Sequence, residues 1–461
     1  MPELLDLCYD VMIKILEEIN PEDVAACAQA SKGFNNFITD NTRLHKTLYL
    51  KHFDDPRRRR PQDREPDWAG ELKRVVDFQK ILHSADNDVK AAAFHSVCTT
   101  AEHLIANMSN DDAGLSQNQQ LIERCLQKIT QNHDAFMCRS SLFARSGRLT
   151  QRPADHEEDR QLSAKLHSLL GFTPRKFGWN DLSNHPYARS RVYDLRNYTD
   201  KNQWGPFRKD GSMLVDWEMV ECLMIVIGYN SYISSQKDPQ LHQVPWFRAL
   251  DGLIPVGLEY SGQGQPEYLT LIRQPDIALD MKDPYGVSAI YTRIVCFLDY
   301  TDLYHFNFSS DAMRLAPDEP RNALSAAEAF RHIIMSLWVT DVTAPGPLDH
   351  PDLPIVHFEG VSSAVNAQWD PSANSGIRGT VRMTREGEVR WQTISVFEGG
   401  EERWRCDGIQ VGGMRCPRGV VGTWFDKDFD AHGPVGPTAF WKIAERLSEP
   451  GREGSDSENN S

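Results

Sequence analysis

The 461-residue sequence lacks a long hydrophobic run and lacks an excess of positive charge. Its densest apolar segment, 222–227, is far shorter than the ~20 residues that cross a bilayer. Acidic residues outnumber basic ones by 65 to 50, and the charge of −15 argues against a surface that coats nucleic acid. Acidic residues also interrupt the first apolar residues, so no signal peptide is predicted. We expect a protein of the cytoplasm or nucleus, with neither membrane nor nucleic acid as a partner.

Cysteines are few and scattered, and no two of the nine form a Cys-x-x-Cys pair. The close ligand spacing typical of zinc sites is therefore missing, and we predict no metal and no cofactor. An odd number of dispersed cysteines is typical of free, mostly buried thiols in a reducing compartment.

The first ~50 residues are patterned as a compact group of helices. Val11, Ile15 and Ile19 recur at i, i+4 and i+8, which predicts one apolar helix face. Asn20 followed by Pro21 is a typical start for the next helix. A unit of this size buries too little surface to be comfortably stable alone, so we expect a partner or the rest of the chain to support it.

Composition indicates five parts along the chain, and we take these as its expected domains and linkers. These are a helical unit at 1–53, a charged and proline-rich linker at 54–70, a helical spacer at 71–171, a β-rich domain at 172–446 and a disordered acidic tail at 447–461. Within the spacer, single helices are expected at 121–137 and at 157–170, the second closed by Gly171.

Strand patterns dominate the second half of the chain. Residues 290–298 are rich in β-branched side chains, and 389–397 alternates in the strand period, with one face formed by Val389, Trp391, Thr393, Ser395 and Phe397. Before and between the strands we expect an extended segment at 187–198, a helix at 215–227 ended by Gly228, and a helix at 324–336. The predicted fold class is α+β, with N-terminal helices followed by a mostly antiparallel, barrel-like β domain.

The N-terminal unit resembles the F-box. The matching segments are Leu7-Cys8-Tyr9-Asp10-Val11, Ile15-Leu16, Ile19-Asn20-Pro21-Glu22-Asp23-Val24, Ala30-Ser31-Lys32-Gly33-Phe34, Ile38 and Leu44. Cys8 stands where the family has proline, and His45 where it usually has tryptophan.

The resemblance implies a non-catalytic subunit of a ubiquitin ligase, which binds a Skp-type adaptor and, through it, cullin and RING subunits. By position, the adaptor-binding residues would be Leu7, Cys8, Val11, Ile15, Ile19, Pro21 and Leu44. The same apolar residues could instead form the helical core, and which of them face the adaptor stays open at the level of sequence.

The rest of the chain resembles the large fungal F-box protein group. The segments that carry this likeness include 189–198, 204–207, 295–300, 350–360, 408–413, 422–424 and 432–434. The ending at 422–433 also looks like the close of the β-barrel in some animal F-box substrate receptors. The likeness implies that the β domain binds a protein substrate, and we select Trp424 and His432 as its candidate contacts. Trp424 could equally belong to the core of the barrel.

No catalytic motif is present: the sequence has no Gly-x-Ser-x-Gly elbow, no phosphate-binding loop and no His-Glu-x-x-His. His350, His357 and His432 with neighbouring acids could form an acid–base or metal site, but ordinary loop and core histidines are the simpler interpretation. Three functions remain: a receptor for a protein substrate, a barrel that holds a small ligand, and an enzyme. A cavity of several hundred Å³ would favour the small ligand, an aromatic groove a peptide, and converging acids and histidines an enzyme.

Overall fold

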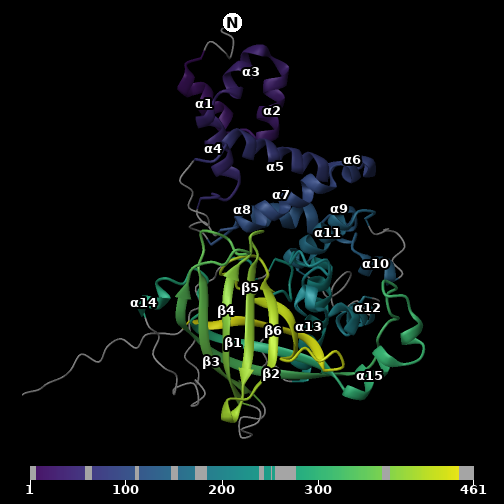
Figure 1. Ribbon diagram of the computed structural model, residues 1–461. Helices are drawn as coiled ribbons and strands as arrows, with labels where there is room; N and C mark the ends of the chain where they lie inside the picture. The colour runs from purple at the N-terminus through teal and green to yellow at the C-terminus, as the bar shows by residue number, and fades with distance from the viewer. Residues whose placement is uncertain are drawn as a thin grey trace, which may run out of the picture. The chain divides into compact units, whose positions relative to one another are not determined.

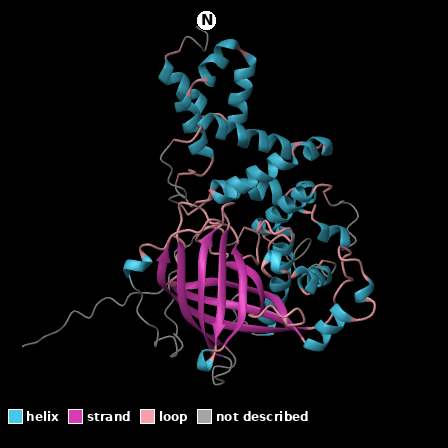
Figure 2. Ribbon diagram, in the orientation of Figure 1, coloured by secondary structure: helices cyan, strands magenta, loops and turns pink. Residues whose placement is uncertain are grey.

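The computed structural model describes most of the chain (Figure 1, Figure 2). The described residues are 7–57, 65–109, 114–146, 154–171, 184–237, 243–250, 252–254, 277–365 and 374–445. The tail predicted at 447–461 lies outside them, as does part of the predicted linker. Within the described part of the chain, no helix is both long and apolar enough to span a membrane.

Contacts divide the chain into two compact units. One, called here the helical unit, comprises Met1–Ala188, Asp216–Ile225 and Trp246–Pro255. The other, called the barrel unit, comprises Arg189–Val215, Val226–Pro245 and Val256–Ser461.

The helical unit begins with four short helices. They are α1 (Tyr9–Glu17), α2 (Pro21–Ala30), α3 (Lys32–Thr39) and α4 (Thr42–His52). Side chains cap two of them: the Ser31 hydroxyl accepts a hydrogen bond from the Gly33 N–H at the start of α3, and Asn41 accepts one from the Leu44 N–H at the start of α4. One face of α1 packs against α4 through buried Met12.

The helices continue with α5 (Trp68–His83), α6 (Asn87–Ala92), α7 (Phe94–Ala106), α8 (Gln117–Ile122), α9 (Thr130–Met137), α10 (Ser141–Arg145) and α11 (Glu157–Leu170). The helix predicted at 157–170 is confirmed, and Gly171 ends it with a φ of 82°. The single helix predicted at 121–137 is wrong, because a π-helical turn at Glu123–Gln127 separates α8 from α9. Apolar periodicity alone does not report such a local change of winding.

One further prediction about local structure is wrong, and a second is wrong only in where the helix ends. Residues 187–198 are not extended: they contain most of α12 (His185–Val192) and a 3₁₀ turn at Leu195–Asn197. Helical winding there brings Arg189 and Tyr193, four residues apart, onto the same carboxylate of Glu328. The helix predicted at 215–227 is α13 (Trp217–Lys237), and it continues through Gly228. A glycine inside a helix costs only about 1 kcal/mol, which the packing of a buried helix outweighs.

Eight strands form a closed antiparallel barrel, drawn in magenta in Figure 2. They are β1 (Ala289–Leu298), β2 (Glu328–Thr343), β3 (Ile355–Ala364), β4 (Asn374–Met383), β5 (Val389–Val396), β6 (Glu402–Gln410), β7 (Val420–Asp426) and β8 (Val435–Glu445). Each strand pairs with the next along the chain, and β8 pairs with β1. The predicted fold class is confirmed.

Strand β2 overturns the helix predicted at 324–336. The alanines at its start favour a helix, but Ile333 and Ile334 pair with strand β1 on one side and β3 on the other. Two complete ladders of hydrogen bonds outweigh the weak local preference.

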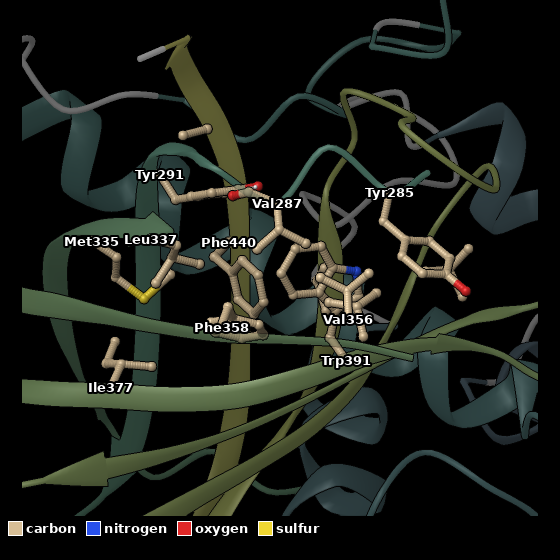
Figure 3. Close-up of a cluster of buried hydrophobic side chains, with 14 of the residues drawn as sticks. Tyr285, Val287, Tyr291, Met335, Leu337, Val356, Phe358, Ile377, Trp391 and Phe440 are labelled. Atoms are coloured by element: carbon tan, nitrogen blue, oxygen red, sulfur yellow. Dashed lines mark hydrogen bonds between the residues drawn. The ribbon is translucent and has the colours of Figure 1, made fainter. Parts of the chain in front are cut away.

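One end of the barrel is filled by aromatic and aliphatic side chains (Figure 3). Trp391 lies at the centre, with its ring centroid 5.5 Å from that of Phe440 and 5.6 Å from that of Phe358. Tyr291 contacts both Trp391 and Phe440 with its ring. The lumen is therefore solid at the end where β1 begins, and any opening must lie toward the end where β1 finishes.

Candidate functional site

Helix α1 presents an apolar face to solvent. Val11 and Ile15, four residues apart on the helix, are 43% and 37% exposed, and Leu7, just before the helix begins, is 39% exposed. Cys8 lies beside them and is also exposed. The opposite face carries the core: Ile13 is 1% exposed. The structure thus separates the apolar stripe of the sequence into an outward face and a buried face, a distinction that spacing alone left open.

The remaining residues predicted to bind the adaptor are less accessible. Ile19 is half-buried, Pro21 is buried and Leu44 is 0% exposed. His45, where the F-box usually has tryptophan, is also buried, and burial lowers the pKa of its imidazole below the ordinary value against the opposing effect of Asp67. These residues therefore contribute mainly to the interior packing of the helical unit, and they offer a partner little exposed surface.

The second candidate site is a cavity of about 390 Å³ inside the barrel. It lies at the end where β1, β3, β5 and β7 finish, opposite the aromatic core. Its lining comprises Arg293, Val295, Phe297, Leu298, Asp299, Tyr300, Arg331, Ile333, Ser362, Ser375, Ser395, Phe397, Trp404, Trp424 and Pro434. The size is within the range of ~300–1,000 Å³ typical of small-molecule sites.

Trp424, one of the two predicted substrate contacts, lines this cavity. Its indole N–H donates to the carbonyl of Cys296 at 3.0 Å, and its ring meets Trp404 edge-on with centroids 5.3 Å apart. His432, the other, is exposed in the loop between β7 and β8, where its ring packs against Phe308 at a tilt of 38°, with centroids 4.8 Å apart. The cavity lining includes Pro434 but not His432.

The histidines considered for an acid–base site are not brought together in the described part of the barrel. His350 lies in the connection between β2 and β3, and His432 lies at the opposite end, between β7 and β8. His357 is hydrogen-bonded to Thr343 at 3.0 Å, across the pair formed by β2 and β3.

One cluster with metal-ligand chemistry occurs among the described residues, on and next to α9. Potential ligand atoms of His133, Asp134 and Cys138 lie within 4.8 Å of one another, and the Cys138 sulfur is 3.5 Å from His133 Nδ1. The three residues come from a single helix and the residue after it, so local winding alone brings them together.

Sequence reasoning missed the polar groups of the cavity. Arg293, Arg331 and the three serines were not selected, because each is unremarkable until closure of the sheet turns it inward. The sequence feature that could have revealed the polar groups of the cavity is Arg293. It is a charged residue in the middle of a mostly apolar strand, on the same alternating face as Tyr291.

Residues 4–46 match the family model of the F-box domain. The chain therefore contains an F-box domain at its N-terminal end, and its second unit contains a closed β-barrel. No curated protein and no solved structure matches the chain. The resemblance to the fungal group is not confirmed and stays a prediction.

Proposed function

We propose that the protein is a substrate-recognition subunit of a Skp–cullin–F-box ubiquitin ligase. The observation that carries the proposal is the exposed apolar surface at α1 within the F-box match, formed by Val11 and Ile15 on the helix and by Leu7 just before it. A regular row of exposed apolar side chains on a helix is costly to leave in water and is typical of a surface that a partner covers. The partner in this proposal is a Skp-type adaptor.

In this role the chain contributes proximity rather than chemistry. The adaptor connects it to the cullin and RING subunits, and the barrel unit selects what is brought to them. Holding a lysine of the substrate near the conjugating enzyme raises its effective concentration, which accelerates transfer without any catalytic residue in the receptor. The nine cysteines are free thiols, which supports a reducing location in the cytoplasm or nucleus.

The test is co-purification of a tagged chain with a Skp-type adaptor. The double variant Val11→Asp, Ile15→Asp places charge on the exposed face while leaving the buried face of α1 intact, so we expect the helices to fold and the adaptor to be lost. The double variant Asn35→Asp, Asn36→Asp is the matched control, because it adds the same two charges at exposed positions of α3. Failure of the wild-type chain to retain the adaptor would overturn the proposal.

A second function is favoured by the cavity in the barrel. Its volume of about 390 Å³ suits a small ligand, and a barrel that holds such a ligand could act as a sensor attached to the ligase. The chemistry of the lining decides which class of ligand it would take.

A further inference from the structure

Arg293 is the most unusual residue of the cavity. It lies near the middle of β1, points into the lumen and is only 6% exposed. Its Nε–H donates to the hydroxyl of Thr438 on β8 at 3.0 Å, and that hydroxyl donates in turn to the carbonyl of Ile294 at 2.9 Å. One edge of the guanidinium is thus fixed by the barrel wall, and its two amino groups have no hydrogen-bond partner among the described residues.

No acidic side chain among the described residues neutralises the charge of Arg293. It forms no ion pair within the described part of the chain, and burial lowers the pKa of its guanidinium from the ordinary value. The Cys406 thiol interacts electrostatically with Arg293, and burial raises the pKa of that thiol to about 11 despite the attraction of Arg293. Cys406 therefore carries no negative charge at neutral pH.

Two other buried arginines of the barrel unit form ion pairs, unlike Arg293. Arg189 lies 3.0 Å from Glu328, and Arg321 lies 3.1 Å from Asp194. An isolated buried cation is strongly unfavourable, so a position that keeps one at the wall of a cavity is a candidate site for an anion.

The rest of the lining is suited to an apolar body with a few polar contacts. Phe297, Phe397, Trp404 and Trp424 contribute aromatic surface, and Arg331 lies at the mouth with its guanidinium 5.6 Å from the Phe297 ring centroid. Three hydroxyls face the same space. Those of Ser362 and Ser375 are 2.8 Å apart and bond to each other, whereas that of Ser395 makes no hydrogen bond within the described residues.

The closed topology argues against an extended peptide as the occupant. Peptides that bind to sheets add a strand to a free edge, and their affinity comes from main-chain hydrogen bonds. Here every strand is paired on both sides around the ring, so no edge is left inside the lumen. A compact molecule held by side chains fits this geometry better.

We propose that the barrel cavity binds a small organic anion. Its carboxylate or sulfonate group bonds to the amino groups of Arg293, its apolar body lies against the aromatic side chains, and Arg331 attracts it at the mouth. This inference goes beyond the proposed adaptor role, and it is tested without the adaptor.

The probe is 1-anilinonaphthalene-8-sulfonate, an aromatic anion whose fluorescence rises on transfer from water, titrated into the full-length chain. Arg293→Met keeps an unbranched stem in the barrel wall but removes the guanidinium and its charge, and we expect it to weaken binding at least about tenfold, as loss of a charge-assisted pair should. Arg293→Lys should recover part of the affinity. Arg378→Met is the matched control and should bind within about twofold of wild type, because Arg378 pairs with Glu402 on the outer face of the same barrel.

A second variant tests volume rather than charge. Ser395→Phe fills the cavity while leaving Arg293 in place, and we expect it to weaken the probe at least about tenfold by excluding its rings. This arm keeps the proposal testable if Arg293→Met fails to fold, which thermal unfolding would reveal.

Displacement identifies the class of ligand. Dodecanoate should displace the probe, whereas dodecanamide, which has the same chain without the charge, should do so at least about tenfold less well. Equal binding of probe by wild type and Arg293→Met, or equal displacement by acid and amide, would overturn the proposal. Tighter displacement by short peptides than by free acids would overturn it in favour of a peptide site. The adaptor-binding double variant should bind the probe normally, so the two proposals fail independently.

Discussion

At the scale of single residues, Glu221 connects three parts of the helical unit. It is 0% exposed on α13, and its carboxylate accepts a hydrogen bond from the Ser140 hydroxyl at 2.7 Å and contacts His167 Nδ1 at 2.5 Å. We expect Glu221→Gln to lower the free energy of unfolding of this unit by about 2 kcal/mol, because buried polar groups lose a charged partner. Hydrogen exchange of peptides from α11 and α13 would measure it.

The control for Glu221 is Glu157→Gln, the same chemical change at an exposed position in the first turn of α11. Its effect should be a few tenths of a kcal/mol, since only a favourable position near the helix N-terminus is lost. Similar protection factors in the two variants would mean that the buried network does not stabilise the unit.

Asp194 makes the stability of the barrel unit depend on pH. Burial alone would raise the pKa of its carboxyl, but hydrogen bonds and charge from Arg196 and Arg321 outweigh it and hold the pKa below the usual 3.8. Because the folded-state pKa is the lower one, the stabilisation is complete above about pH 4 and is lost as the pH falls through the folded-state value.

The variant Asp194→Asn should therefore be less stable than wild type by about 2 kcal/mol at pH 7, and the difference should shrink as the pH falls below 4. Urea unfolding of both proteins at a series of pH values between 3 and 7 checks this. A difference that stays constant down to the acid limit would show that Asp194 is not ionised in the folded barrel.

At the scale of secondary-structure elements, close packing of β4 depends on Gly379. A Cβ atom built there would press on the carbonyl oxygen of Gln392 in β5 and lie 2.5 Å from the Phe358 ring, which covers the glycine. We expect Gly379→Ala to destabilise the barrel unit by about 2–3 kcal/mol, through strain at a backbone that cannot move away freely. Gly376→Ala on the same strand meets nothing closer than 3.4 Å and should cost under about 1 kcal/mol. Thermal unfolding of the two variants tests the contrast.

The same scale shows what the sequence could predict. Elements with strong local signals were found: α11 with its glycine end, and β5 with its alternating apolar face. Elements whose secondary structure depends on residues distant in the sequence were predicted wrongly. Strand β2 begins with a run that favours a helix, and 187–198 is helical where it contacts Glu328.

The candidate sites divide in the same way. The F-box helices carry an ordered local motif, so their family could be predicted, but the exposed and buried faces of α1 could not be told apart until α4 covered one of them. The cavity depends on which residues of eight separate strands face one another, and no local pattern reports that. Trp424 was selected for its setting between glycines, whereas Arg293 needed the closed barrel to stand out.

At the scale of the whole molecule, the two candidate sites lie in different compact units. Their ligands should therefore slow hydrogen exchange in different segments of the chain. An organic anion at a free concentration one hundred times its dissociation constant should stabilise the barrel unit by about 2.7 kcal/mol through mass action. Hydrogen exchange should then slow in β1 and β5, which form walls of the cavity. A Skp-type adaptor should instead slow exchange in α1, whose outward face it would cover.

Two variants distinguish the exchange protection caused by the organic anion from the exchange protection caused by the adaptor. Arg293→Met should reduce protection of β1 by 1-anilinonaphthalene-8-sulfonate and leave adaptor protection of α1 unchanged, whereas Val11→Asp with Ile15→Asp should remove adaptor protection of α1 and leave probe protection of β1 unchanged. Protection by the probe that spreads equally over all described helices would indicate nonspecific binding to apolar surface, because a specific ligand stabilises most the elements that it contacts. The molecule's charge of −15 strengthens the test, since general attraction of an anion to the surface is unfavourable and specific binding must come from local groups such as Arg293.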